Sequence, residues 1–239
     1  MDNDPLDPLD PLERLEEEQR TRPVSRAEFH RQLAELDGQL VEVAQRVADA
    51  IGPVTTAFLQ ADRYLADQYA DAVAEVRRRC VGLEETGFVL LARQAPVAVD
   101  LRRVIAVLRC TREVHRSGNL IAHIAASLTW IHPPSIGEHL RQVVAQLGAV
   151  SAELFHAAVE AWRSHDGLAA PELEAKDDQV DLLQKVLLTE LYTGDQSVEE
   201  SVSLALLGRY YERIGDHAVE LAHQVAYFVT GDRPTPTER

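Results

Sequence analysis

The feature that most constrains the fold of this chain is an apolar periodicity of three and four residues that continues from residue 25 to about residue 230. Such steps place the apolar side chains on one face of an α-helix. Strand signals, such as alternating β-branched runs and Asn-Gly turns, are essentially absent. The pattern therefore predicts an all-α protein built from long antiparallel helices packed in bundles. The rhythm is most regular between residues 100 and 130, at Val104, Val107, Thr111, Val114, Gly118, Ile121, Ala125 and Leu128.

Capping and helix-breaking residues divide this pattern into six predicted helices. Ser25 followed by Glu28 has the form of an N-terminal capping box. Pro53 is expected to kink the first helix rather than end it, because the apolar face continues beyond it. Pro133 and Pro134 separate the third helix from the fourth. The six predicted ranges are 25–59, 63–92, 100–130, 135–163, 171–192 and 197–230.

The two halves of the chain resemble each other, which indicates an internal repeat. The segment that starts at Asp62 matches the segment that starts at Asp166, an offset of 104 residues. Residues 113–119 match residues 210–216 at an offset of 97. We therefore predict two three-helix bundles in tandem, a first repeat at 25–132 and a second repeat at 133–231.

Two terminal segments lie outside the predicted bundles. Residues 1–24 repeat the triplet Asp-Pro-Leu at Asp4, Asp7 and Asp10 and then add a run of glutamates. Proline at every third residue blocks both helix and sheet, and high charge disfavours a packed core. We expect residues 1–24 to be a flexible acidic tail that can serve as a docking segment, and residues 232–239 to be a disordered C-terminal tail.

Composition limits the classes of function. The chain has 39 acidic and 24 basic side chains in 239 residues, a net charge of -15, which argues against a general nucleic-acid binder. Cys80 and Cys110 form no disulfide framework and lack metal-ligand spacing. The N-terminus has no apolar core of a signal peptide, and no apolar run approaches the roughly 20 residues that span a bilayer. We therefore expect a soluble, cytoplasmic protein without a membrane span.

A stripe of acidic residues marks the last predicted helix. Glu212, Asp216, Glu220 and His223 fall within one arc of that helix. Burying several like-charged carboxylates is costly unless a cation or a hydrogen-bond donor compensates them. The same stripe is also compatible with the solvated face of an ordinary amphipathic helix. The spacing alone leaves both interpretations open.

Two motifs give the chain a resemblance to a known family. The first is Glu-Arg-Ile-Gly-Asp-His at residues 212–217, and the second is Gln-Ala-Pro-Val-Ala-Val-Asp-Leu-Arg at residues 94–102. Together they resemble PhoU proteins over residues 25–231, with all six helices in order. The resemblance implies a fold of two three-helix bundles related by a pseudo-twofold similarity.

The resemblance also implies a function. PhoU proteins regulate phosphate uptake by coupling the high-affinity phosphate ABC transporter to a sensor histidine kinase. They are not enzymes, and they keep phosphate-starvation genes off when phosphate is plentiful. The partners implied for this chain are the ATPase subunit of the transporter and the histidine kinase, and we expect the chain to form a homodimer.

The acidic motifs of the family bind metal ions in some members, and the resemblance carries them to four residues of the second repeat. Asp177 and Asp181 lie four residues apart on the fifth predicted helix, and Glu212 and Asp216 lie four apart on the sixth. Such pairs on adjacent helices can face each other and supply oxygen ligands. Mg²⁺, Mn²⁺ or iron suits these ligands, and carboxylates alone do not choose among them. The alternative is a set of exposed acids that pair with neighbouring cations such as Lys185.

The first repeat departs from this pattern at each corresponding position. Val73 and Arg77 replace the two acids of the fifth helix, and His115 and Asn119 replace those of the sixth. A valine and an arginine cannot ligate a cation, so we expect the first repeat to have lost the site. His115, Asn119 and His123 share a stripe that a softer metal could use, although a polar surface face is the simpler interpretation.

Other interpretations stay open. Arg102, Arg109, Arg112 and Arg116 form a stripe that is either a docking surface for an acidic partner or phosphate, or a solvated face balanced by glutamates. A helical scaffold without a phosphate role would explain the periodicity but not the two motifs. A carboxylate-bridged di-metal enzyme needs paired Glu-x-x-His ligands, a spacing that the chain has at residues 220–223.

Overall fold

The computed structural model describes residues 25–232 of the chain. These residues form long α-helices with two short 3-10 helices between the halves, and no strand occurs within this range. The predicted all-α class is therefore confirmed. The two predicted tails lie outside the described residues, apart from Asp232. The elements are α2 (Arg26–Leu59), α3 (Arg63–Gln94), α4 (Ala98–Ala126), η1 (Ser127–Thr129), η2 (Pro133–Ser135), α5 (Glu138–Ser164), α6 (Ala170–Thr193) and α7 (Val198–Thr230).

Side-chain caps begin α2, α3 and α7, and of these the cap at Ser25 was predicted from the sequence. Ser25 Oγ accepts a hydrogen bond from the backbone N–H of Glu28 at 3.2 Å, although the Glu28 carboxylate bonds other side chains instead of completing the box. A complete capping box stands at the start of α7, where Ser197 and Glu200 each bond the backbone N–H of the other. α2 continues through Pro53, as predicted.

The third and fourth helices are shorter than predicted. α4 ends at residue 126 rather than 130, because the chain tightens into η1 and Ser127 Oγ donates to the carbonyl oxygen of His123 at 2.9 Å. α5 begins at Glu138 rather than at residue 135, because the backbone of Ile136 and Gly137 is extended. Both differences lie in the connection between the two repeats.

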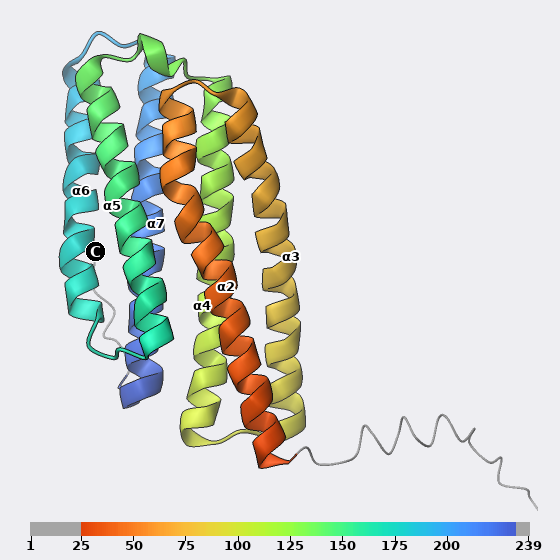
Figure 1. The fold of residues 1–239 in the computed structure, drawn as a ribbon. Helices are drawn as coiled ribbons and strands as arrows, with labels where there is room; N and C mark the ends of the chain where they lie inside the picture. Colours follow the sequence, from red (N-terminus) through yellow and green to blue (C-terminus); the bar gives the residue numbers. More distant parts are fainter. Residues whose placement is uncertain (1–24, 233–239) are drawn as a thin grey trace, which may run out of the picture.

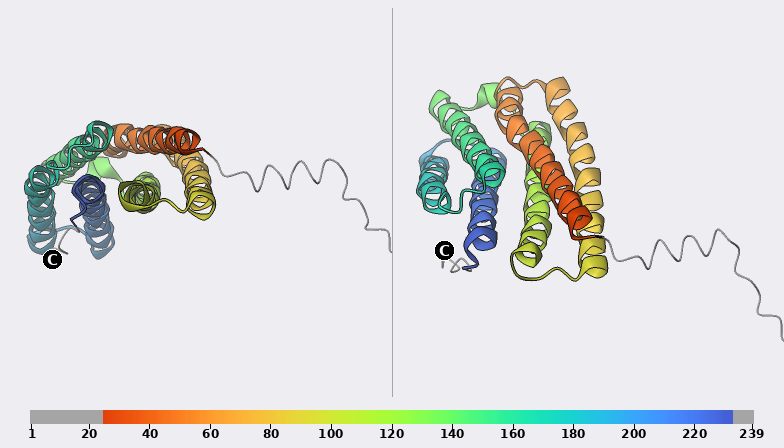
Figure 2. Two further views of the ribbon diagram at one scale, coloured as in Figure 1. Left: turned by 90° about the horizontal axis from the view of Figure 1, so that it is seen from below. Right: turned by 60° about the horizontal axis from the view of Figure 1, so that its bottom comes forward.

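The six long helices pack as two groups of three (Figure 1). α2, α3 and α4 contact one another, and so do α5, α6 and α7. The groups join where α2 packs against α5 and α4 packs against α7. Seen along the helices, α6, α5, α2 and α3 form a curved outer row, and α4 and α7 lie on its inner side (Figure 2). The predicted pair of three-helix bundles is present, and both layers take part in the contact between them.

The two bundles share one hydrophobic core. A single cluster of buried apolar side chains extends through all six long helices. Within it, Tyr211 of α7 is fully buried, and its hydroxyl lies 2.8 Å from Thr55 Oγ1 of α2. Packing is therefore continuous across the boundary that the sequence places at residue 133.

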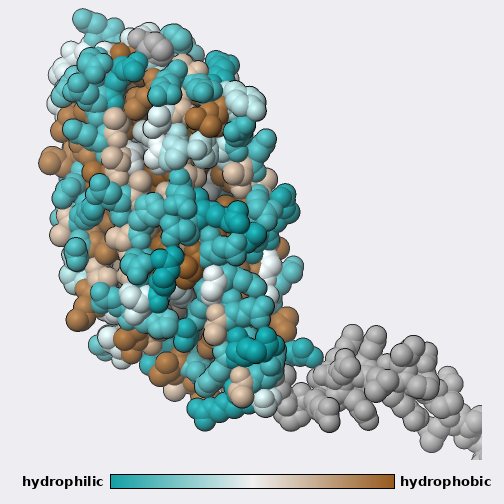
Figure 3. All heavy atoms as spheres, in the orientation of Figure 1, coloured by the Kyte–Doolittle hydropathy of each residue, from teal (hydrophilic) through white to brown (hydrophobic). Residues whose placement is uncertain are grey.

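The outer face of the molecule carries no single apolar band. In Figure 3 the hydrophobic residues on this face are scattered among hydrophilic ones. No helix in the described part of the chain has the length and hydropathy that a membrane span requires.

Candidate functional site

The candidate site lies along the contact between α6 and α7. Gly215 of α7 faces Asp177 of α6, and a Cβ at Gly215 would collide with Asp177 Oδ1. The missing side chain lets the two helices approach closely at the level of the acidic motif. Asp177 is fully buried there. Gly215, itself part of the motif seen in the sequence, thus makes room for the Asp177 carboxylate.

Glu212 lies one helical turn before Asp216 on α7 and is only 9% exposed. Its Oε1 accepts a hydrogen bond from Arg209, whereas its Oε2 is buried and has no hydrogen-bond partner among residues 25–232. Burial raises the pKa of Glu212 to about 7, and the negative charges of Asp216 and Asp181 add to the rise. The Arg209 guanidinium acts in the opposite direction. Mutual repulsion among the carboxylates is therefore part of the electrostatics of this site.

All four predicted residues thus lie near the α6–α7 contact, with Asp181 and Asp216 partly exposed. The four carboxylates, which include the buried Oε2 of Glu212, offer the oxygen ligands that a hard cation prefers. Within residues 25–232, however, no three or more His, Cys, Asp or Glu side chains are arranged to hold a metal ion. Since Arg209 engages Oε1 of Glu212, a cation that took this carboxylate as a ligand through Oε2 would share it with the guanidinium. Metal binding by these residues stays a prediction.

The rest of the acidic stripe forms a second cluster with a residue that the sequence analysis missed. His223 Nε2 lies 2.7 Å from Glu174 Oε1 of α6, and His223 Nδ1 lies 3.9 Å from Glu220 Oε2. Hydrogen bonding to Glu220, and then to Glu174, raises the pKa of His223. Glu174 precedes Asp177 by three residues, so its helical spacing was the available signal. The Glu-x-x-His spacing at residues 220–223 therefore belongs to a cluster that links α6 to α7 electrostatically.

The corresponding place in the first repeat is apolar. Gly118 of α4 faces α3, and a Cβ at Gly118 would lie 3.2 Å from Val76 Cγ1 and 3.7 Å from Val73 Cγ1. Gly118 thus occupies the place that Gly215 has in the second repeat. Arg77 donates a hydrogen bond to Asn119 Oδ1 at 3.1 Å, so the other two counterparts bond each other. No carboxylate stands where the second repeat has its acidic residues.

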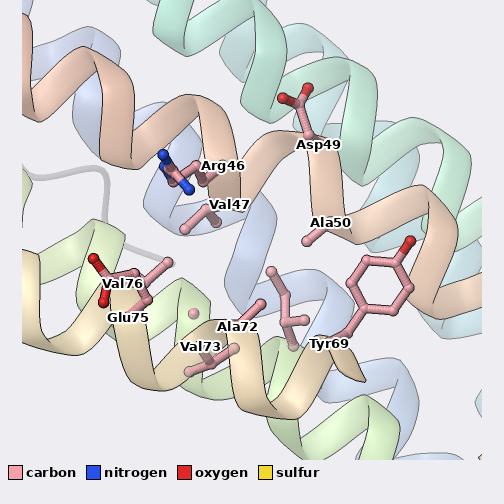
Figure 4. Close-up of a pocket in the computed structure, with 11 residues that line it drawn as sticks. Arg46, Val47, Asp49, Ala50, Tyr69, Ala72, Val73, Glu75 and Val76 are labelled. Atoms are coloured by element: carbon pink, nitrogen blue, oxygen red, sulfur yellow. The ribbon is translucent and has the colours of Figure 1, made fainter. Parts of the chain in front are cut away.

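A pocket of about 390 Å³ lies at this level of the first repeat, between α2, α3 and α4. Val47 and Ala50 of α2 and Val73 and Val76 of α3 line it (Figure 4). Its charged lining residues are Arg46, Asp49 and Glu75, and each of them already forms an ion pair or a hydrogen bond. Its small and apolar walls offer a cation no set of oxygen ligands.

His115, Asn119 and His123, the polar stripe of α4, lie in three different environments. His123 stacks against Tyr210 of α7, with ring centroids 5.4 Å apart. Asn119 accepts from Arg77. His115 Nε2 is buried and has no hydrogen-bond partner among the described residues. No cluster of three or more His, Cys, Asp or Glu side chains that could hold a metal ion occurs in residues 25–232. These contacts therefore give no support to a site for a softer metal.

A buried polar cluster that the sequence analysis did not predict joins α4 to α7. His217 Nδ1 lies 2.9 Å from Ser117 Oγ, and His217 Nε2 lies 3.4 Å from Glu113 Oε2. Burial lowers the pKa of His217 to about 4, helped by the charges of Arg213 and Arg116, so the imidazole is neutral at neutral pH. Ser117 and His217 are both buried, so the cluster links the two bundles and is closed to a substrate.

Comparison with known proteins shows the family of this chain. The PhoU domain model matches residues 40–128 and 144–225, one segment in each repeat. The phosphate-specific transport system accessory protein PhoU homolog 1 of Mycobacterium leprae is 37% identical over 212 residues, which cover 87% of this chain and 96% of that protein. Homolog 2 of Mycobacterium tuberculosis is 36% identical over 212 residues, with coverage of 87% and 100%.

Two solved structures show the same fold. PhoU from Streptococcus pneumoniae superposes with a TM-score of 0.79 at 21% identity, covering 87% of this chain and 99% of that one. PhoU from Pseudomonas aeruginosa superposes with a TM-score of 0.76 at 24% identity, covering 85% and 100%. The match of the domain model to both repeats, together with relatives above 30% identity over most of the chain, shows that this protein belongs to the PhoU family.

Proposed function

We propose that this protein is an accessory regulator of phosphate transport. In this role it couples the phosphate ABC transporter, through its ATPase subunit, to a sensor histidine kinase, and it represses phosphate-starvation genes when phosphate is abundant. The observation that carries the proposal is membership of the PhoU family over both repeats, with relatives named as phosphate-specific transport accessory proteins. The two motifs at residues 94–102 and 212–217 support the more detailed role through the family resemblance.

The proposed mode of action is binding to other proteins, without turnover. The Ser117–His217 pair is buried, and His223, which follows Glu220 by three residues, already bonds Glu174. Charged faces on long helices can steer a partner of complementary charge and select for it. The proposed partners place the protein in the cytoplasm, where we expect it to work as a homodimer. Light scattering coupled to size-exclusion chromatography tests the dimer, and a mass of one chain at micromolar concentration would contradict it.

We also propose that the second repeat binds a divalent or iron cation (Mg²⁺, Mn²⁺ or Fe). Asp177, Asp181, Glu212 and Asp216 are the ligands in this proposal, and the clustering of their charges at the α6–α7 contact supports it. A bound cation would neutralise carboxylates that now repel one another.

Substitution of the exposed pair tests this site. We predict that Asp181→Ala or Asp216→Ala weakens binding of Mn²⁺ at least tenfold in calorimetry, because each removes an oxygen ligand. His115→Ala and Asn119→Ala, at the equivalent positions of the first repeat, are the matched controls and should leave the affinity unchanged. Equal losses in both sets would contradict the asymmetry between repeats, and a wild-type protein that binds no cation would remove the site.

Gene deletion tests the regulatory role. A strain that lacks this gene and every related gene should express phosphate-uptake genes even in phosphate-rich medium, and restoring this gene should silence them. Transcript levels measure the outcome. Genes that stay silent in the full deletion strain would leave the alternative, a helical scaffold without a phosphate role. Co-purification with the transporter ATPase or the kinase separates direct coupling from an indirect effect.

A further inference from the structure

The pocket between α2, α3 and α4 of the first repeat lies outside the candidate cation site and plays no part in the proposed function. Its volume of about 390 Å³ is within the range that is usual for small-molecule pockets. Apolar side chains form its floor, and four of them are at most 6% exposed: Val47, Val73, Val76 and Ile121. The pocket therefore offers a ligand an apolar surface that lies between three helices.

The second repeat has longer side chains at the equivalent level. The offset of 104 residues, which also separates the starts of the two PhoU-domain matches, makes the fully buried Leu154 the counterpart of Ala50. The same offset makes Lys176 the counterpart of Ala72. Lys176 Nζ lies 2.7 Å from Glu153 Oε2 and thus bridges α6 to α5. Alanine at both positions of the first repeat leaves the space between α2 and α3 neither filled nor bridged.

The surroundings of the two equivalent glycines show the same difference. For a Cβ at Gly215 of the second repeat, Leu154 Cδ2 of α5 would be among the three nearest atoms, at 3.5 Å. For a Cβ at Gly118 of the first repeat, the three nearest atoms all belong to Val73 and Val76 of α3 and none to α2. α2 therefore leaves space where α5 fills it.

The charged side chains that line the pocket already have partners within the chain. Arg46 forms an ion pair with Glu42 at 3.0 Å, and Glu75 pairs with neighbouring arginines of α3. Asp49 points away from α3 (Figure 4), and its Oδ1 lies 3.6 Å from His156 Nε2 of α5. A charged ligand would lose hydration in this pocket without gaining a free group of opposite charge. The lining thus favours an uncharged ligand.

Tyr69 gives the pocket a polar group that can bond a ligand. Its ring lies beside Ala50, between α2 and α3 (Figure 4). Among residues 25–232 the Tyr69 hydroxyl has no hydrogen-bond partner. A phenolic hydroxyl can both donate and accept a hydrogen bond. A ligand with either kind of polar group can therefore be oriented by Tyr69.

We propose that this pocket binds an uncharged, mainly apolar small molecule that carries a hydrogen-bonding group for Tyr69. The ligand occupies the space that Leu154 and Lys176 fill in the second repeat, and it links α2 to α3. Burial of its apolar surface drives binding. The inference goes beyond the proposed role in phosphate transport, because it gives the first repeat a ligand whose chemistry is unlike that of the cation proposed for the second.

Titration of the full chain with 4-fluorophenol, followed by ¹⁹F NMR, tests the pocket. This probe is an apolar ring with one hydroxyl and is uncharged at neutral pH. We expect saturable binding with a dissociation constant of about 1 mM or lower, as a probe of so few atoms allows. 4-Fluorobenzoate, a ring of similar size with a negative charge, should bind at least tenfold more weakly because burial of its charge is not compensated.

Filling the pocket should remove binding. Ala50→Leu introduces the side chain found in the second repeat and should weaken binding of 4-fluorophenol at least tenfold, because it occupies the space of the ligand. Ala72→Leu, on the facing helix, is an independent variant with the same expected loss. Ala74→Leu, at an exposed position of α3 outside the pocket, is the matched control and should bind like the wild type. Melting curves show that each variant is folded.

A further variant tests the polar contact. Tyr69→Phe should weaken binding of 4-fluorophenol and leave binding of fluorobenzene unchanged, because only the phenol can bond the hydroxyl of Tyr69. An equal change for both probes would contradict the role of this hydroxyl and leave a purely apolar pocket.

Four results would overturn the proposal. The first is a wild-type protein that shows no saturable binding of 4-fluorophenol. The second is binding that survives both Ala50→Leu and Ala72→Leu, or that falls equally in the Ala74→Leu control. The third is binding of 4-fluorobenzoate as tight as that of 4-fluorophenol, which would assign the pocket to a charged ligand. The fourth is loss of co-purification with a protein partner in Ala50→Leu when the wild type binds no probe, which would mean that the pocket holds an apolar side chain of that partner.

Discussion

Buried charges decide much of the residue-scale behaviour of this protein. Asp37 of α2 is 6% exposed and forms an ion pair with Arg103 of α4, and this pair ties two helices of the first bundle together. Burial raises the pKa of Asp37 to about 6, although Arg103 acts in the opposite direction. A buried ion pair of this kind has a net effect on stability that depends on pH.

The stability of the protein should therefore respond to pH through Asp37. The folded state binds a proton at Asp37 more tightly than the unfolded chain, whose reference pKa is 3.8, so this residue's contribution falls as pH rises from about 4 to 6. Asp37→Asn removes this dependence. We predict that the unfolding free energy of the wild type, relative to the variant, drops by about 2 kcal/mol between pH 4.5 and 7.5. Urea titrations at both pH values measure it, with Asp71→Asn, an exposed acid on α3, as control; a constant difference would contradict the prediction.

The close approach of α6 and α7 leads to a second prediction at the residue scale. Gly215→Ala should destabilise the protein by about 2 kcal/mol, because the added methyl group collides with the Asp177 carboxylate and forces the helices apart. Gly82→Ala, on α3, is the control, since no atom lies within 4 Å of its added Cβ. Alanine there should stabilise the helix by about 0.5–1 kcal/mol. If denaturant midpoints moved equally for both variants, helix propensity and not the contact would govern Gly215.

At the scale of elements, α7 holds the second bundle together. It contacts α5 and α6 within its own bundle and α4 of the other, and it carries Glu212 and Asp216, two of the four residues of the candidate site. It also bonds α2 through Tyr211 and Thr55. The capping box of Ser197 and Glu200 fixes the N-terminus of α7. Loss of this cap should therefore weaken the packing of α7 against the other helices.

Removal of the cap should measure this dependence. Ser197→Ala leaves the backbone N–H of Glu200 without its side-chain acceptor and should lower the unfolding free energy by about 1 kcal/mol. Ser201→Ala, in the first turn of the same helix, should change it by less than about 0.5 kcal/mol, because alanine is the better helix former. Thermal denaturation followed by circular dichroism compares the two. A smaller effect at Ser197 than at Ser201 would show that the cap is dispensable.

At the scale of the whole molecule, two repeats share one core. The cluster of buried apolar side chains is continuous, and the bonds from Tyr211 to Thr55 and from His217 to Ser117 cross between the bundles. Neither bundle can unfold alone without exposing apolar surface of the other to water. The sequence repeat therefore does not imply two independent folding units.

Unfolding should accordingly be a single cooperative transition. In a Trp130→Phe variant the remaining indole, Trp162, is buried and reports on the second bundle and on its contact with Asp37 of α2, whereas circular dichroism reports on all helices. We predict that the two signals give the same urea midpoint. Cys80→Ala with Cys110→Ala, which loosens only the first bundle, should lower both midpoints together. Two separated midpoints would show that the bundles unfold independently.

The sequence by itself determined the number of long helices, most of their ends and the pairing of the repeats. Helical periodicity, caps such as Ser25 and breakers such as Pro133 act within a few residues, so they can be read along the chain. The offsets between the repeats also made Val73 the counterpart of Asp177. The structure confirms this equivalence, because Gly118 faces Val73 and Gly215 faces Asp177. The family resemblance rested on two short motifs, which can likewise be read along the chain.

Only the tertiary structure decided what each charged side chain meets. The family resemblance, together with helical spacing, predicted Asp177, Asp181, Glu212 and Asp216 as ligands on two adjacent helices, but not that Arg209 would take one oxygen of Glu212. The pairs Asp37–Arg103, Ser117–His217 and Glu174–His223 join residues that are distant along the chain. Such partners are set by how helices cross and by which gaps their side chains leave. These depend on packing of the whole core, which no local pattern encodes.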